Sequence, residues 1–203
     1  MRLGVLVSGR GSNLEAVLAA RPPGIEPVLV ISNRAGVRAL TIAASHGVPV
    51  RVLRRSDFGG NAPARDAAIG EALTAAGAEL ALLAGYDQLL LPSYFAAFRG
   101  RTINIHPSLL PAHGGPGMLG QAVHRSVLAA GDTETGATVH EVTADLDSGP
   151  ILASARVPVL PADDAEALAA RVLAEEHRLL VATLADLGIR WATQPTSGRS
   201  AAE

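Results

Sequence analysis

Short, uninterrupted runs of apolar residues recur through the first half of the chain and alternate with segments of helical periodicity. The apolar runs predict buried strands, and the segments between them predict helices that end at glycines. The predicted strands span residues 3–8, 27–32, 48–53, 80–84 and 101–105. One predicted helix begins near residue 14, and two others span residues 38–46 and 63–76. This alternation is typical of a parallel sheet covered by helices on both faces.

The pattern changes in the second half. Residues 119–130 predict a helix, residues 136–143 alternate like a half-buried strand, and residues 151–160 predict another strand, with Arg156 on an exposed face. Residues 163–187 predict one long amphipathic helix, with Asp163 or Asp164 as its N-cap and Gly188 as its end. The fold class that follows is α/β: a doubly wound, mostly parallel, Rossmann-like sheet with an antiparallel C-terminal extension and a long C-terminal helix.

The domain organisation follows from the same pattern. With 203 residues, of which 48% are hydrophobic, the chain can sustain one core. We expect a single domain over residues 1–190. Its first half, 1–100, would bind a phosphate or nucleotide, and its second half, 101–190, would carry the catalytic groups. Residues 191–203 are small and polar and predict a flexible tail.

Composition excludes several classes of function. A net charge of -2 gives no basic surface for nucleic acid, and no apolar run is long enough to span a membrane. The apolar part of the N-terminus is too short for a signal peptide, so we expect a soluble, cytoplasmic protein. The chain has no cysteine and no lysine, which excludes thiolate metal sites, cysteine nucleophiles, Schiff bases and the P-loop lysine.

Three polar segments fall at the carboxyl ends of predicted strands: residues 8–13, 85–88 and 104–108. Ligands of open α/β sheets bind beyond these ends, so the three segments should be neighbours in space.

The first of them is a glycine loop, GRGSN, that opens a helix. Free backbone N–H groups and the helix dipole favour an anion such as a phosphate at Gly11, Ser12 and Asn13. The alternative is a tight turn in which Ser12 or Asn13 caps the helix. A dinucleotide site is disfavoured because Leu14 replaces the third glycine and Asn33, not an acid, closes the second strand.

Asn104 and His106 are two residues apart on a predicted strand and therefore share a face. An amide and an imidazole on one face can flank a carbonyl oxygen, stabilise an oxyanion and pass a proton. Asp147, in a glycine-containing turn, is the best carboxylate to orient the imidazole. Each residue also has an ordinary structural reading, as a turn former or a packed histidine. A nucleophilic triad through Ser108 is disfavoured, because no GxSxG context surrounds it.

Three further histidines, His113, His124 and His140, lie in the second half. His140 sits on the alternating strand and faces either the site or solvent. No HxH or HxxxH spacing supports a metal site, so we expect no metal.

Together these motifs resemble the folate-dependent formyltransferases. The matching segments are VLVSGRGSNL, LLAGY (82–86), NIHPSLLP (104–111), GATVHEVTADLDSGPIL (136–152) and VLAEEH (172–177), in order over about residues 1–187. The resemblance implies the formyltransferase fold and transfer of a formyl group from 10-formyltetrahydrofolate to the amine of 5'-phosphoribosylglycinamide, in purine biosynthesis.

The resemblance also implies roles for single residues. Gly11, Ser12 and Asn13 would hold the substrate phosphate, and Glu176 would contact the glycinamide. Asn104 and protonated His106 would stabilise the oxyanion, and Asp147 would hold the charge of His106 and relay protons. The folate pocket would be formed by Asp87, Gln88, Leu89, Leu90, Asn104, Val142 and Thr143. Partners would be these small molecules, without nucleic acid or membrane, for a monomer or homodimer.

This chain departs from the family pattern at three places. Asp87-Gln88 stand where a basic pair is common, Asn61 stands where an arginine is expected with Arg65 nearby, and the loop at 113–124 is a variant. The nearest rival activities are formyl transfer to an amino-sugar nucleotide or to methionyl-tRNA, although the tRNA enzyme has an added C-terminal domain that we do not expect here. An NAD-dependent oxidoreductase and a non-catalytic binding protein are the rivals of other classes.

Overall fold

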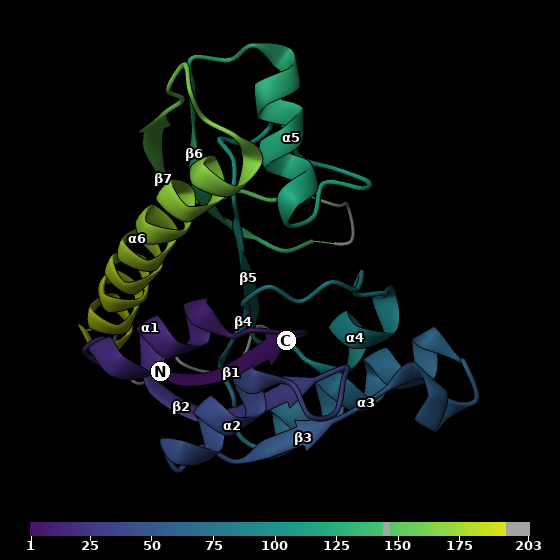
Figure 1. Cartoon of the computed structure of the whole chain (residues 1–203). Helices are drawn as coiled ribbons and strands as arrows, with labels where there is room; N and C mark the ends of the chain where they lie inside the picture. The colour runs from purple at the N-terminus through teal and green to yellow at the C-terminus, as the bar shows by residue number, and fades with distance from the viewer. Residues whose placement is uncertain (144–146, 194–203) are drawn as a thin grey trace.

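The computed structural model describes residues 1–143 and 147–193. Its centre is a seven-stranded sheet in the order β3-β2-β1-β4-β5-β6-β7 (Figure 1). The strands are β1 (Arg2–Val7), β2 (Glu26–Ser32), β3 (Val50–Val52), β4 (Leu80–Leu83), β5 (Arg101–His106), β6 (Glu134–Glu141) and β7 (Ile151–Pro158). All seven strands were predicted from the sequence, with small differences at their ends.

The pairing of the strands confirms the predicted fold class. β1 to β5 pair in parallel, β6 pairs antiparallel with β5, and β7 pairs antiparallel with β6. The half-buried character predicted for β6 is wrong: residues 135–140 are all buried. The strand lies between β5 and β7 and packs against the long C-terminal helix, so its polar residues, including His140, also point into the protein.

Helices cover both faces of the sheet. They are α1 (Ser12–Ala20), α2 (Arg38–Ser45), α3 (Ala62–Ala75), α4 (Pro92–Ala97), α5 (Gln121–Ala130), α6 (Ala165–Thr193) and the 3-10 turn η1 (Arg55–Phe58). One apolar core joins α1, α2 and α6 to the sheet, and a second joins α3 and α4 to its other face. The sequence did not predict α4 and η1, which are too short to show a period. No described helix has the length and hydropathy needed to cross a membrane.

The long helix α6 runs past its predicted end. Its start was predicted correctly, because the Asp164 carboxylate accepts hydrogen bonds from the backbone N–H groups of Glu166 and Ala167. Gly188 does not end the helix: a Cβ there would lie 2.2 Å from the carbonyl oxygen of Pro23, so this glycine permits close packing. Residues 191–193, predicted as part of a tail, are helical, and residues 194–203 lie outside the described part.

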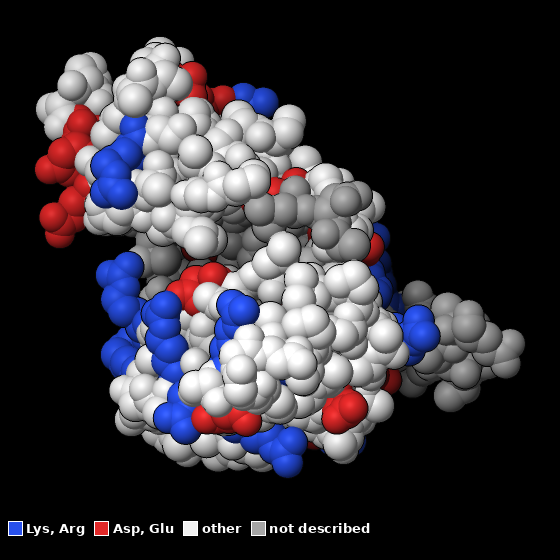
Figure 2. Space-filling view, turned by 90° about the vertical axis from the view of Figure 1, so that its right-hand side faces the viewer, with Lys and Arg blue, Asp and Glu red and all other residues white. Residues whose placement is uncertain are grey.

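The chain reverses its winding between β1 and β4, which are neighbours in the sheet. In a doubly wound sheet this switch point opens a crevice beyond the carboxyl ends of the strands. Figure 2 shows the surface hollowed between the half that holds β1 to β4 and the half that holds β6, β7 and α5, with basic side chains on the rim of the first half. The three polar segments predicted to be neighbours follow β1, β4 and β5 at this edge.

Candidate functional site

The glycine loop presents an uncapped helix start. Gly11 is the N-cap of α1 with φ of 74°, and no described side chain caps the helix. A Cβ on Gly11 would lie 2.6 Å from the Cβ of Ala39, so the loop is pressed against the start of α2 and requires glycine. The alternative prediction, that Ser12 or Asn13 caps the helix, is therefore wrong. The first backbone N–H groups of α1 have no partner within the helix, an arrangement that favours an anion.

The side chain of Asn13 instead contacts α6. Its Nδ2 donates a 2.8 Å hydrogen bond to Oε2 of Glu176, and both residues are only 7% exposed. Burial raises the pKa of Glu176 to about 7, and the hydrogen bond from Asn13 opposes that rise in part. Within the described residues, Oδ1 of Asn13 is buried without a partner. A carboxyl group and an amide oxygen without a described partner therefore lie next to the start of α1, where they could bind the polar groups of a ligand.

The burial of Glu176 predicts how the stability of the protein depends on pH. Unfolded, this group loses its proton near its ordinary pKa of 4.5, whereas folded it keeps the proton up to about pH 7. Its burial therefore lowers the free energy of unfolding progressively between pH 4.5 and 7, by roughly 3 kcal/mol above that window. Glu176→Gln should remove this loss, so denaturant unfolding should show a stabilisation at pH 8 that is absent at pH 4. An equal effect of the substitution at both pH values would contradict the assignment.

The predicted catalytic residues meet at the end of β5. Asn104 lies directly opposite His140 in the β5–β6 pairing, and its Nδ2 contacts Nε2 of that histidine at 3.1 Å. The Asp147 carboxylate stands between two imidazoles: Oδ2 is 3.9 Å from Nδ1 of His106, and Oδ1 is 3.7 Å from Nε2 of His140. Asn104, His106 and Asp147 are thus brought together, with His140 as a fourth member of the cluster.

His140 is the member whose place the sequence left open. Its Nδ1 contacts the carbonyl oxygen of Glu141 at 2.9 Å, and because a carbonyl can only accept, Nδ1 carries the proton. The lone pair of Nε2 then accepts from Asn104. Burial lowers the pKa of His140, with the Glu141 carbonyl and Asp147 opposing the change, so the ring is held neutral. The missing signal was the strand pairing, because directly opposed residues of antiparallel strands share a face.

His106 is oriented by the loop that follows it. Its Nε2 lies 2.9 Å from the carbonyl oxygen of His113, so Nε2 carries a proton and Nδ1 faces Asp147. Asp147 has φ of 52°, and its Oδ2 also accepts a 2.9 Å hydrogen bond from the N–H of Gly115. Ser108 is fully buried and donates to the carbonyl oxygen of Ala112, so the nucleophilic reading of this serine is wrong.

The remaining histidines have other surroundings. His113 contacts Ser126 and Asp132, and burial together with His106 lowers the pKa of His124. Among residues 1–143 and 147–193, no three His, Cys, Asp or Glu side chains are grouped as metal ligands would be.

The segments predicted to hold folate flank β5, which carries the predicted catalytic residues. Residues 87–90 follow β4 and residues 142–143 follow β6, and these strands pair with either side of β5. The N–H of Val142 is tied to the carbonyl oxygen of Thr102 at 2.8 Å. Leu89 is 52% exposed, whereas Leu90 is 2% exposed and belongs to the core, so Leu90 could offer only its backbone.

Two arginines from other elements reach the segment that lacks the usual basic pair. Arg34 forms an ion pair with Asp87, which also accepts a 2.8 Å hydrogen bond from Asn33. Arg65 donates to the side chain of Gln88 at 3.2 Å and is itself buried against Asp66. The positive charge near residues 87–88 therefore comes from the β2 end and from α3.

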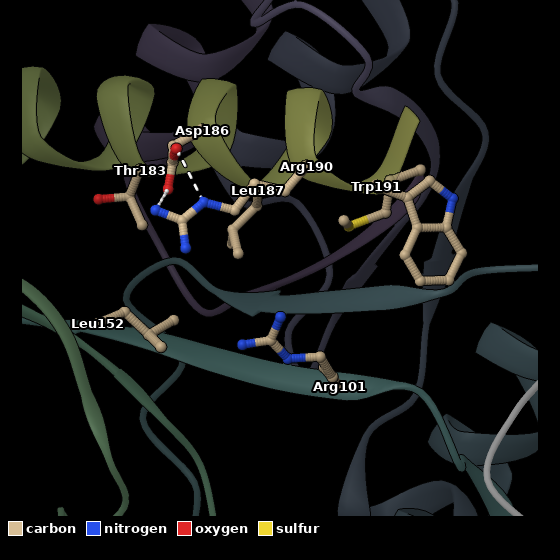
Figure 3. A pocket seen from close by; sticks show the side chains of 8 residues that line it. Arg101, Leu152, Thr183, Asp186, Leu187, Arg190 and Trp191 are labelled. Atoms are coloured by element: carbon tan, nitrogen blue, oxygen red, sulfur yellow. Dashed lines mark hydrogen bonds and ion pairs between the residues drawn. The ribbon is translucent and has the colours of Figure 1, made fainter. Parts of the chain in front are cut away.

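A separate cavity of about 290 Å³ lies at the opposite edge of the sheet (Figure 3). Arg101, at the start of β5, lines it, and His106 ends that strand about 16 Å away. The two arginines that line the cavity are already in ion pairs, Arg101 with Glu141 and Arg190 with Asp186. This cavity is therefore no part of the catalytic cluster.

Comparison with known proteins gives one consistent result. Residues 1–184 match the formyl transferase family. The chain is 45% identical over 199 residues to the phosphoribosylglycinamide formyltransferase of Mycobacterium tuberculosis, covering 95% of this chain and 87% of that protein. The structure of glycinamide ribonucleotide transformylase 1 from Symbiobacterium toebii is similar with a TM-score of 0.86 and 40% identity, covering 94% of this chain and 88% of that one.

Some relatives are much longer. The trifunctional purine biosynthetic protein adenosine-3 of Drosophila pseudoobscura is 43% identical over 184 residues, which cover 87% of this chain but 13% of that protein. The chain therefore corresponds to one part of these trifunctional proteins.

Proposed function

The chain belongs to the formyl transferase family, and we propose that it transfers a formyl group from 10-formyltetrahydrofolate to the amine of 5'-phosphoribosylglycinamide. The products would be formylglycinamide ribonucleotide and tetrahydrofolate, and the reaction would serve purine biosynthesis in the cytoplasm. The observation that carries the proposal is the convergence of Asn104, His106 and Asp147 at the end of β5. Relatives of similar length named for this activity support it.

The catalytic cluster suits attack of an amine on a formyl carbon. As the carbon–nitrogen bond forms, the formyl oxygen gains negative charge, and the Asn104 amide and protonated His106 would stabilise it. One N–H of Asn104 is directed to His140, which leaves the other for the oxyanion. The tetrahedral intermediate then collapses with loss of N10 of the folate, and the proton lost by the amine reaches that nitrogen. His106 and Asp147 would carry this proton, with a water between them across their 3.9 Å separation.

The substrate end of the site would be formed by α1 and α6. The N–H groups of Gly11, Ser12 and Asn13 would bind the ribonucleotide phosphate. Glu176, held by Asn13, would receive the polar glycinamide, and the free Oδ1 of Asn13 would accept one of its hydrogens. A ligand that donates hydrogen bonds to Glu176 would stabilise its carboxylate form. Glu176 should therefore favour the glycinamide substrate over less polar analogues that lack such donors.

The folate end would lie between residues 87–90 and 142–143. We propose that Asp87, Gln88, Leu89, Leu90, Asn104, Val142 and Thr143 form this pocket, largely through backbone and apolar contacts. The co-substrate and the ribonucleotide would be the partners of a monomer or homodimer.

Formyl transfer to phosphoribosylglycinamide, followed by absorbance, tests the proposal with wild type and Asp147→Asn side by side. The amide keeps the shape of Asp147 but removes the charge that faces His106, so we expect kcat to fall by about a hundredfold or more. Wild type without activity, although it binds the ribonucleotide phosphate, would show that the substrate is wrong. Amino-sugar nucleotides would then be the next acceptors to assay.

A further inference from the structure

One short loop contacts both members of the predicted proton relay. The carbonyl oxygen of His113 accepts from Nε2 of His106 at 2.9 Å, and two residues later the N–H of Gly115 donates to Oδ2 of Asp147 at 2.9 Å. The preceding carbonyl, of Ala112, accepts from buried Ser108 at 2.6 Å. The backbone of residues 112–115 therefore determines where the imidazole and the carboxylate stand relative to one another.

The side chain of His113 anchors this loop to the layer behind it. Its Nδ1 contacts Oγ of Ser126 on α5 at 2.8 Å, and its Nε2 contacts Oδ2 of Asp132, after that helix, at 2.6 Å. The backbone at His113 is left-handed, with φ of 54°, a conformation that few residues other than glycine adopt. Two side-chain hydrogen bonds hold this conformation and turn the carbonyl toward His106.

We propose that His113 is a positioning residue for formyl transfer, which acts through its carbonyl on the tautomer and orientation of His106. The acceptor at Nε2 keeps a proton on that nitrogen, so the proton exchanged during the reaction enters and leaves at Nδ1, facing Asp147. The inference rests on the proposed function, and it assigns a role within the variant loop at 113–124.

Several charged or titratable groups surround this arrangement. Asp147 faces His106 from the turn between β6 and β7, His140 faces it from β6, and His124 lies near it on α5. Asp132 pairs with His113. A change in the proton equilibrium of His106 must therefore be measured at that ring itself, not inferred from the pH dependence of the whole protein.

The first measurement is ¹⁵N NMR of the His106 ring in the free protein, over pH, in wild type and in His113→Ala. We expect wild type to show the neutral, Nε2-protonated tautomer at pH values above those at which the ring is charged, and the variant to show a mixture of the two neutral tautomers. In the assay, His113→Ala should lower kcat about ten- to hundredfold with little change in KM. In a His106→Ala background the same change should have almost no further effect, because the two residues act as a unit.

Three variants keep the test decisive if His113→Ala folds poorly. Ser126→Ala and Asp132→Ala each remove one anchor without touching the loop backbone, and each should reproduce part of the change in the His106 ring signals. His113→Asn tolerates the left-handed backbone and keeps one anchor, so it should restore much of the activity. Unchanged His106 signals in His113→Ala and in the two anchor variants, or an equal loss of kcat when His113→Ala is added to wild type and to His106→Ala, would overturn the inference. Because the NMR signals need no substrate, they separate this outcome from a failure of the proposed reaction, which would appear as inactive wild type.

Discussion

Replacing His106 with alanine is expected to lower kcat for formyl transfer by about 10²- to 10⁴-fold. The ring is 4% exposed and held on one side by the His113 carbonyl, with Nδ1 directed to Asp147. Alanine removes both the positive charge beside the developing oxyanion and the group that exchanges the proton. Within the described residues, no hydrogen bond or ion pair joins this ring to the proposed phosphate site at Gly11–Asn13, so affinity for the ribonucleotide should change little. Kinetics at saturating substrate concentrations would measure kcat, and calorimetry would measure the affinity for the ribonucleotide.

The matched control for that variant is His46→Ala. His46 is the C-cap of α2 and is exposed, and its ring contacts only its own helix, at the carbonyl oxygen of Ile42 and Oγ of Ser45, among the described residues. Loss of this histidine should leave kcat at the wild-type value. If His106→Ala kept more than a tenth of wild-type kcat while remaining folded, acid–base catalysis at His106 would be wrong.

Asn104→Ala should lower kcat by about 10²- to 10³-fold, the usual effect of removing one donor from an oxyanion site. The amide is part of β5 and is fixed by its contact with neutral His140, so it is already oriented before the substrate arrives. The alanine variant also leaves Nε2 of His140 without its donor. We therefore expect the pH profile to broaden as that ring becomes easier to protonate.

Asn61→Ala is the matched control for this second variant. Oδ1 of Asn61 accepts from the N–H of Ala64 and caps α3, away from the cluster. Its loss should cost about 1 kcal/mol of stability without lowering kcat. Denaturant unfolding of both variants would separate the two effects, and a comparable fall in kcat for Asn61→Ala would count against a specific role of Asn104.

The sequence predicted the strands because each is an apolar run bounded by turn residues, and these signals are local. It also predicted that Asn104 and His106 share a face, since side chains alternate along a strand. It did not predict that His140 completes the cluster or that Asn13 contacts Glu176. Both depend on strand pairing or helix docking between residues far apart in the chain.

The predicted end of the long C-terminal helix at Gly188 was also wrong. The sequence signal of Gly188 is the same whether a glycine ends a helix or lets a helix approach another backbone. The packing decides in favour of the second, because a Cβ on Gly188 would lie only 2.2 Å from the carbonyl oxygen of Pro23. The prediction that β6 is half-buried was wrong because polarity does not by itself show exposure: Thr135 and Thr138 are polar but buried within the fold.

The hydrogen bond from Asn13 to Glu176 has a consequence for how the protein assembles. It joins residues separated by 163 positions, between the first and last helices of the described chain. Closing so long a loop is entropically unfavourable, so we expect this contact to form late in folding. A nascent or partly folded chain would hold the glycine loop but not its partner on α6. Ribonucleotide binding should therefore select the finished fold and protect it by mass action from unfolding and proteolysis.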